Sequence, residues 1–294
     1  MFRTLEEGDT VGIVAPASPV TAERIKPAVA WLKSRGYQVK LGQSIGKSDR
    51  FLAGSDANRS RDLSEMFSDD TVRAIFTARG GFGSSRMLDL IDWSIVKANP
   101  KPFIGFSDTT ALQLGLFAKA GLISLTGIAL ASDAAEGPPP RGIEDDLALA
   151  LGKGEFNPVP GLPSKVSLSG TLIGGCLSLV THLIGTPYLP DLQGQILMLE
   201  DVGESPYRVD RMLTQLMLSK ILEPATAVLL GIFFDCTGDE EDGSVEDVLA
   251  EFSARCPCPV IKGLPYGHGP VRRVLPIGGR VEIKDGTMRI ERLQ

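Results

Sequence analysis

Three polar residues of the types used in acyl transfer lie next to short apolar segments of this sequence. Ser107 and Glu200 each directly follow an apolar run, and His268 lies between two glycines after a third. A serine hydroxyl becomes an effective nucleophile when a base accepts its proton, and a carboxylate can orient that base and stabilise its charged form. We therefore interpret Ser107, Glu200 and His268 as a candidate nucleophile, orienting acid and general base that act on a peptide-like amide.

The segment around the serine reads Gly105-Phe106-Ser107-Asp108, between a predicted strand at 101–106 and a predicted helix. A serine at a strand-to-helix turn is held out of the sheet, and the free N–H groups of the first helical turn can bind a negatively charged oxygen. The second glycine of a Gly-x-Ser-x-Gly turn is absent here. Because serine and aspartate are also common helix caps, the alternative is that Ser107 or Asp108 only caps the helix.

The acid can be either of two neighbours, because Glu200 and Asp201 both stand at the end of the apolar run 195–199. Successive residues of a strand point to opposite faces, so only one of the two can reach His268. Asp201 also suits a helix cap. For His268 the competing interpretation is a solvated loop position, and the second histidine, His182, lies in an apolar helical stretch and is interpreted as structural.

A glycine-rich loop, Arg-Gly-Gly-Phe-Gly, spans residues 79–83 after another predicted strand. Glycines let a backbone approach a ligand closely and let its N–H groups face a negative oxygen. The spacing does not match a dinucleotide-binding or P-loop motif. The loop is therefore a candidate for binding an oxyanion, and an ordinary strand-to-helix turn is the alternative.

Composition and charge argue against several function classes. The 294 residues carry a net charge of −6 with lysine and arginine scattered along the chain, whereas a nucleic-acid surface needs a basic face. The four cysteines and two histidines show no metal-ligand spacing, and Cys256-Pro257-Cys258 lacks the two-residue spacer of a redox or zinc pair. We predict no metal and no cofactor, no nucleic-acid partner, and a small molecule or short peptide as the partner.

The sequence also carries expectations about location. The N-terminal residues lack the basic stretch and apolar core of a secretory signal, and the longest apolar runs are half of the ~20 residues that cross a bilayer. We therefore expect a cytoplasmic protein with free thiols and no membrane partner.

Short apolar strands alternate with helical stretches over residues 1–132, which is typical of βαβ units and an α/β domain with a mostly parallel sheet. Residues 133–165 are rich in proline and glycine and predict an inter-domain linker. Residues 166–294 predict a second domain, which carries the acid and the base and ends in a hairpin at Asp285-Gly286. All three chemical candidates fall near carboxyl ends of predicted strands, where open α/β sheets bind their ligands.

Five motifs occur in order along nearly the whole chain. They are Gly12-Ile13-Val14-Ala15-Pro16-Ala17-Ser18, Arg79-Gly80-Gly81-Phe82-Gly83, Gly105-Phe106-Ser107-Asp108, Leu199-Glu200-Asp201-Val202-Gly203-Glu204 and Gly267-His268. In this order they resemble the motifs of the LD-carboxypeptidase family, the muramoyltetrapeptide carboxypeptidases, and of its relative, the microcin C immunity peptidase.

The resemblance implies a role for individual residues. It makes Ser107 the nucleophile, Glu200 the acid and His268 the base, and it places the oxyanion hole at the backbone N–H groups of Gly81 and Asp108. It also implies an N-terminal parallel-sheet domain, a C-terminal β-rich α/β domain with the active site between them, and a homodimer. The implied reaction releases the terminal D-alanine from a cytoplasmic murein tetrapeptide in cell-wall recycling.

Other residues and other functions remain as alternatives. Arg79, Glu204 and Arg208 are candidates for binding the charged ends of a substrate, with surface salt bridges as the competing explanation. A microcin-immunity type of hydrolase would act on acyl-aminoacyl adenylates, but the extra loop that carries its adenine-stacking aromatic has no evident counterpart between residues 163 and 200. A non-catalytic peptide-binding module would have no need of serine, glutamate and histidine together.

Overall fold

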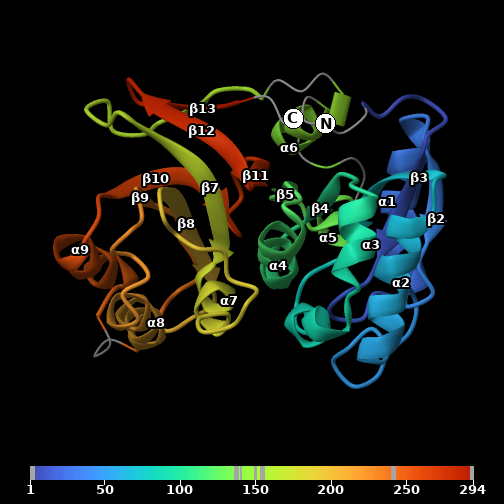
Figure 1. Ribbon diagram of the computed structural model, residues 1–294, viewed down its shortest axis with the longest axis horizontal. Coiled ribbons are helices and arrows are strands. Elements are labelled where there is room, and N and C mark those ends of the chain that lie inside the picture. The colour runs from blue at the N-terminus through green and yellow to red at the C-terminus, as the bar shows by residue number, and fades with distance from the viewer. Residues whose placement is uncertain are drawn as a thin grey trace.

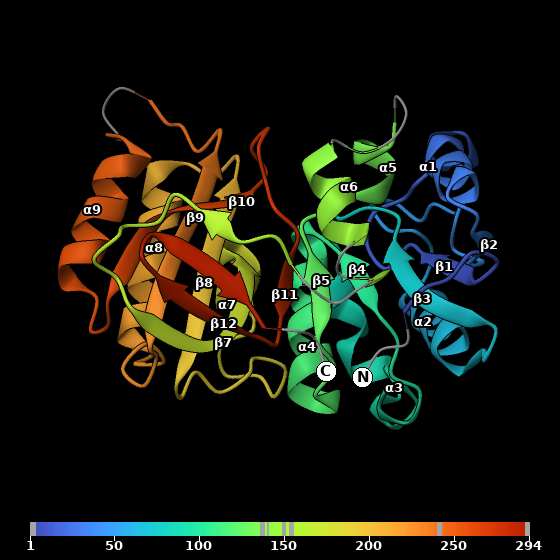
Figure 2. The same cartoon turned by 90° about the horizontal axis from the view of Figure 1, so that it is seen from above.

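The structure is a computed structural model that describes residues 4–135, 139, 141–148, 151–152, 156–239 and 243–291. Its two sheets lie side by side, one built mainly from the first half of the chain and the other from the second half (Figure 1). Seen from above, helix α4 (Thr110–Ala120) and strand β11 (Leu275–Ile277) lie where the two halves meet (Figure 2). The two-domain α/β fold expected from the sequence is confirmed.

The first sheet has the strand order β11-β5-β4-β3-β1-β2. Its other strands are β1 (Thr10–Val14), β2 (Gln38–Leu41), β3 (Val72–Thr77), β4 (Phe103–Gly105) and β5 (Ser124–Thr126). The pairs among these five are parallel, and β11 runs antiparallel to β5. A strand from the second half of the chain therefore completes the mostly parallel sheet of the first half, a crossing that the sequence patterns did not predict.

Helices cover both faces of the first sheet. Helices α1 (Ala22–Ser34) and α5 (Leu130–Asp133) lie on one side, and α2 (Asp56–Ser68) and α3 (Trp93–Ala98) lie on the other (Figure 2). Strand β1 is buried on both sides, with Val11 in one apolar cluster and Val14 in the other. This explains why β1 reads as an apolar run without alternation.

The second sheet has the strand order β10-β9-β8-β7-β12-β13-β6. Its strands are β6 (Val159–Pro160), β7 (Leu168–Cys176), β8 (Gln195–Val202), β9 (Ala227–Phe234), β10 (Val260–Gly267), β12 (Gly279–Lys284) and β13 (Thr287–Ile290). Strands β7 to β10 are parallel, and the remaining pairs are antiparallel. The predicted hairpin is confirmed, because Asp285 and Gly286 both have positive φ (51° and 74°) between β12 and β13, as a tight hairpin turn requires.

Helices α7 (Leu177–His182), α8 (Pro206–Leu218) and α9 (Val245–Arg255) lie together along one face of the second sheet (Figure 1). Helix α6 (Arg141–Ala148) falls in the segment predicted as a linker. Asp146 of this helix accepts two hydrogen bonds of 2.7 Å from Arg273, in the loop before β11. Helix α6 of the connecting segment is thus hydrogen-bonded to the second half of the chain.

A close backbone approach docks the second sheet on α4. Gly175 of β7 has a φ of +139°, and a Cβ placed there would stand 2.5 Å from Thr110 Oγ1. The N–H of Cys176 donates to the same hydroxyl at 3.2 Å. Cys176 pairs with Glu200 in the register of β7 and β8. The contact with Thr110 therefore fixes β8, which carries Glu200, relative to α4, which begins three residues after Ser107.

We predict that Gly175→Ala destabilises the protein by at least ~2 kcal/mol, because the added methyl group meets Thr110 and the backbone is in a region that side chains rarely adopt. Thermal unfolding should show a Tm several degrees below that of the wild type. The matched control is Gly142→Ala on α6, where a Cβ meets no atom within 4 Å and alanine favours the helix. A Gly175→Ala protein with wild-type Tm would show that α4 and β7 do not depend on this approach.

Candidate active site

The serine stands on a strained turn at the end of β4. Phe106 is fully extended (φ −163°, ψ 162°), and Ser107 then adopts a φ of +66°, which costs a residue with a side chain about 1–3 kcal/mol. A short 3₁₀ turn, η2 (Ser107–Thr109), leads from there into α4. The N-cap positions here are Phe106 for η2 and Thr109 for α4, and the Ser107 hydroxyl bonds His268 instead, so the capping alternative does not describe Ser107.

A chain of two hydrogen bonds joins the three candidate residues. The Ser107 hydroxyl lies 2.9 Å from Nε2 of His268, and Nδ1 of the same ring lies 2.7 Å from Oε2 of Glu200. The histidine side chain is 19% exposed, whereas Glu200 is fully buried. The imidazole therefore contacts the hydroxyl on one edge and a carboxylate shielded from water on the other.

Burial has the largest effect on the pKa of Glu200. It raises the pKa of Glu200, and the hydrogen bond and charge of His268 act in the opposite direction. A carboxylate kept out of water gains most from a positive charge beside it, because the local dielectric constant is low. Glu200 is thus placed to stabilise an imidazolium when His268 accepts a proton.

Strand geometry decides between the two neighbouring acids. Strand β8 continues through both, so Glu200 faces His268 and Asp201 faces the opposite side. The Asp201 carboxylate accepts hydrogen bonds from two backbone N–H groups, that of Ser178 at 2.8 Å and that of Val202 at 2.9 Å. Asp201 therefore bonds the start of α7 from the neighbouring strand, whereas the N-cap of α8, the helix that follows it in sequence, is Ser205.

The glycine-rich loop lies directly against the serine turn. A Cβ at Gly80 would stand 2.7 Å from the Ser107 Cβ and 3.1 Å from the backbone nitrogen of Asp108. The Asp108 carboxylate accepts the N–H groups of Gly83 (3.2 Å) and Ser84 (2.8 Å). The aspartate after the nucleophile therefore holds the loop in place instead of capping its own helix.

A second serine supports the loop from the other side. The Ser18 hydroxyl accepts the N–H of Phe82 at 3.1 Å, and the Ser18 N–H donates to the carbonyl of Gly80 at 3.3 Å. Gly81, between them, has a φ of +102°, and a side chain there would overlap Ser18. The first sequence motif contains Ser18, but no spacing rule pointed to this contact because the two segments are far apart in the chain.

The three charged candidates differ in their surroundings. Arg79 lies beside Gly81 and is partly buried. Its burial, and to a smaller extent the nearby positive charge of Arg24, lower the pKa of its guanidinium. It has no carboxylate partner within the described ranges. The partly buried Glu204 and the exposed Arg208 instead form an ion pair of 3.6 Å four residues apart, and His182, the last residue of α7, is exposed.

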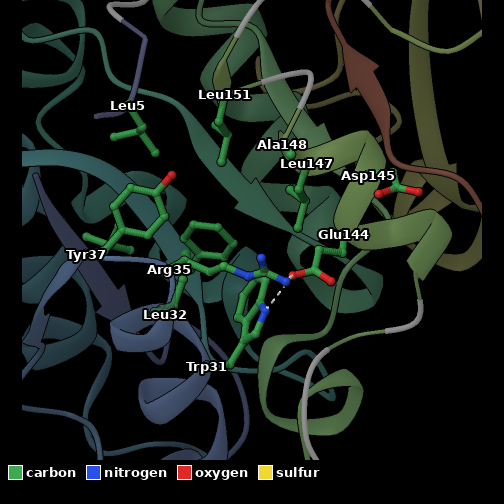
Figure 3. Close-up of a pocket in the computed structure, with 12 residues that line it drawn as sticks. Leu5, Trp31, Leu32, Arg35, Tyr37, Glu144, Asp145, Leu147, Ala148 and Leu151 are labelled. Carbon is green, nitrogen blue, oxygen red and sulfur yellow. Dashed lines mark hydrogen bonds and ion pairs between the residues drawn. The ribbon is translucent and has the colours of Figure 1, made fainter. Parts of the chain in front are cut away.

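A separate cavity of about 270 Å³ lies between α1 and α6, away from these residues (Figure 3). Its apolar walls include Leu5, Trp31 and Leu147, and Glu144 accepts a hydrogen bond from the indole N–H of Trp31 at 3.1 Å. Neither the serine nor the histidine of the hydrogen-bonded chain borders it. We therefore assign the candidate active site to the hydrogen-bonded chain.

The described ranges contain no group of three or more His, Cys, Asp or Glu side chains placed to hold a metal ion. None of the helices found there has the length and apolar character needed to cross a membrane.

Comparison with known proteins identifies the family. Residues 11–127 match the LD-carboxypeptidase N-terminal domain, and residues 169–283 match the LD-carboxypeptidase C-terminal domain. The chain belongs to the LD-carboxypeptidase family. The resemblance expected from the five ordered motifs is confirmed.

Several relatives of this LD-carboxypeptidase family member carry functional names. It is 36% identical over 294 residues to a probable murein peptide carboxypeptidase of Bacillus subtilis (strain 168), covering 95% of this chain and 89% of that protein. The crystal structure of a muramoyltetrapeptide carboxypeptidase from Oxalobacter formigenes aligns with a TM-score of 0.87 at 33% identity, over 97% of this chain and 99% of that one. The microcin C7 self-immunity protein solved with aspartyl sulfamoyl adenosine aligns with a TM-score of 0.87 at 27% identity, over 99% and 98% of the two chains.

We predict that Glu200→Gln lowers kcat of this LD-carboxypeptidase family member on the order of 10⁴-fold, the effect of the equivalent change in a serine protease. The amide keeps the shape of the acid but removes the charge that stabilises the imidazolium. Asp201→Asn is the matched control, because Asp201 bonds only Cys176, Ser178 and Val202 in the described structure. Rates at saturating substrate decide, and an inactive Asp201→Asn beside a nearly normal Glu200→Gln contradicts the assignment.

The same substitution should not weaken the fold at neutral pH. The pKa of Glu200 is raised by folding, so the folded protein binds a proton more readily than the unfolded chain. Stability then falls as the pH rises from the ordinary carboxyl pKa through the raised one. We predict that Glu200→Gln removes this fall and has a Tm at pH 7 equal to or above that of the wild type. A Tm several degrees lower would show that the ionised carboxylate stabilises the fold.

Proposed function

We propose that this protein is a serine carboxypeptidase that releases the terminal D-alanine of murein tetrapeptides. The observation that carries the proposal is the hydrogen-bonded chain from the Ser107 hydroxyl through His268 to the buried Glu200. Membership of the LD-carboxypeptidase family and the names of the murein-acting relatives support the substrate class.

In the proposed reaction, Ser107 Oγ attacks the carbonyl carbon of the scissile amide while Nε2 of His268 accepts the hydroxyl proton. The imidazolium then donates that proton to the amine of the departing D-alanine, which leaves an acyl-enzyme. A water molecule, activated by the neutral imidazole, attacks the ester and restores Ser107. Glu200 holds the ring orientation throughout and stabilises its charged form.

The proposed oxyanion hole consists of the backbone N–H groups of Gly81 and Asp108. Its support is the close packing of the glycine loop on the Ser107 turn and the carboxylate of Asp108, which bonds the next part of that loop. Donors held rigidly where charge develops cost no reorganisation during the reaction. The strained φ of Ser107 is consistent with this arrangement, because it presents the hydroxyl beside the loop.

A carboxypeptidase has to recognise the free carboxylate that ends its substrate. We propose Arg79 for this role, because its guanidinium lies beside Gly81 and has no carboxylate partner among the described residues. Glu204 and Arg208 are weaker candidates for the opposite end of the peptide. They already pair with each other near the surface, and an ion pair screened by solvent contributes little to the fold, so a substrate can displace it.

The setting of the enzyme is proposed on the same basis. We propose a cytoplasmic homodimer that needs no metal or cofactor, with domains at residues 1–132 and 166–294 joined by the linker at 133–165. The family matches at 11–127 and 169–283 support the two boundaries. The dimer rests on the family resemblance alone, and light scattering of the purified protein tests it directly.

The second candidate is cleavage of an acyl-aminoacyl adenylate. The structural likeness to the microcin C7 self-immunity protein favours it, since that protein binds aspartyl sulfamoyl adenosine in its solved complex. Both reactions would use the same nucleophile and base. The two candidates are therefore separated by substrate, not by the residues of the catalytic chain.

We predict that the wild-type protein converts a diaminopimelate tetrapeptide to a tripeptide and D-alanine, measured by mass spectrometry. An aspartyl adenylate analogue with a cleavable linkage, offered at the same concentration, should be cleaved much more slowly. The reverse preference would replace the first candidate by the second. No cleavage of either compound would contradict both.

Ser107→Ala should lower turnover of the tetrapeptide by several orders of magnitude, because it removes the covalent nucleophile. Stability should change by no more than ~1 kcal/mol, because the substitution removes only the hydroxyl and its hydrogen bond to His268. Ser205→Ala is the matched control, since this serine also precedes a helix and makes no capping side-chain bond. A Ser107→Ala variant that keeps a tenth of the wild-type rate would rule out the covalent role.

Chelators should leave turnover unchanged, because the proposed mechanism uses no metal. Replacing all four cysteines by alanine should affect stability only, with the largest loss at the buried Cys176, whose thiol lies 3.5 Å from the Asp201 carboxylate. Turnover is measured after dialysis against EDTA and again after addition of zinc. Activity that disappears with EDTA and returns with zinc would overturn the mechanism.

A further inference from the structure

The aromatic ring before the nucleophile is the meeting point of three side chains from the second half of the chain. The centroid of Phe106 lies 4.5 Å from that of the His268 ring and 5.8 Å from that of Tyr266. The guanidinium carbon of Arg272 lies 5.2 Å from the same centroid, within the range of a cation–π interaction. One ring attached to the nucleophile turn therefore contacts the base directly and an arginine four residues beyond the base.

Arg272 is itself anchored on the first half of the chain. Its Nε donates to the carbonyl of Gly127 at 2.8 Å, and its guanidinium pairs with Asp133 at the end of α5. The Asp133 carboxylate also accepts the N–H of Ala129 at 2.6 Å. The two charged side chains are only 12% and 10% exposed, so this is a well-shielded pair held by several hydrogen bonds.

The hydrogen bonds of His268 do not by themselves fix the plane of its ring. Its two bonds leave from Nδ1 and Nε2, so they define an axis from Glu200 to Ser107 about which the imidazole can tilt. Restraint of that tilt requires a contact on the face of the ring. Phe106 supplies such a contact, with an angle of 37° between the two ring planes.

We propose that Arg272 is a positioning residue for the base, acting through Phe106. Held by Gly127 and Asp133, its guanidinium keeps the Phe106 ring in place, and the Phe106 ring restrains the tilt of His268. The inference rests on the proposed role of His268 as the general base. It adds that the accuracy of proton transfer depends on an arginine whose hydrogen bonds go to Gly127 and Asp133, outside the chain of Ser107, His268 and Glu200.

The neighbouring residue offers a matched control. Arg273 also forms a shielded ion pair, two bonds of 2.7 Å to Asp146, and its side chain is 18% exposed. It belongs to the same loop but does not stack on Phe106 in the described structure. Arg272→Met and Arg273→Met therefore each remove one buried ion pair, and only the first removes the stacking contact.

We expect Arg272→Met to lower kcat for the tetrapeptide at least tenfold with KM within about twofold, since small displacements of a catalytic group cost up to 10²-fold. Arg273→Met should keep kcat per folded molecule within about twofold of wild type at a comparable loss of Tm. Phe106→Leu should lower kcat as Arg272→Met does, and the double variant should be no worse than Phe106→Leu alone, because the two residues act in series. Equal kcat values for the two arginine variants, or losses that multiply in the double variant, would overturn the inference.

A measurement that needs no substrate separates this inference from the proposed function. The Nδ1 proton of His268, bonded to Glu200, should give a downfield proton NMR signal in the wild type and in Arg273→Met. The signal should broaden or shift in Arg272→Met and in Phe106→Leu. If Arg272→Met does not fold, Arg272→Lys keeps the charge but not the guanidinium over the Phe106 ring and should show the same change in smaller degree. An unchanged signal in folded Arg272 and Phe106 variants rejects the positioning role, whether or not the protein cleaves the tetrapeptide.

Discussion

The hydrogen bond between Ser107 and His268 crosses from one sheet to the other, so it exists only when the two sheets are docked in register. Ser107 follows β4 of the first sheet, whereas Glu200 belongs to β8 of the second sheet and His268 directly follows β10. Strand β11 joins the first sheet beside β5, directly after the loop of the base, and Gly175 lets β7 approach α4 closely. The fold therefore assembles the nucleophile and the base by the same contacts that unite its two halves.

The cost of this arrangement is concentrated at two positions. Ser107 has a left-handed backbone conformation, and Glu200 is a carboxylate enclosed by the core, where burial raises its pKa. Neither feature stabilises the fold, since a strained residue and a buried charge are both unfavourable. Both favour the proposed chemistry, because the turn exposes the hydroxyl and the shielded charge interacts strongly with an imidazolium. Strain and buried charge of this kind are typical of active sites.

The parts of the fold that depend on local pattern could be predicted from the sequence. Apolar runs indicated β1, β3 and β4 of the first sheet but not the short β5, the Asp285-Gly286 pair indicated the hairpin, and period-two alternation already allowed only one of Glu200 and Asp201 to reach the histidine. Contacts between distant segments could not be predicted this way. Nothing in local periodicity indicates that residues 275–277 pair with β5, or that Arg272 stacks on Phe106, because such contacts depend on tertiary packing. Gly263 and Pro265 are unusual inside a strand, so the sequence did not indicate that β10 continues to Gly267 through a register shift.

Labelling of the serine by a fluorophosphonate tests the central claim most directly, because this reagent reacts with a serine only where a base activates it. The reaction is run on the native protein and on the chain unfolded in urea, and the adduct is mapped by peptide mass spectrometry. If docking of the two sheets creates the reactive centre, one adduct forms, on Ser107, in the native protein alone. An adduct on another serine, or equal labelling of Ser107 in the native and unfolded chains, would contradict the account.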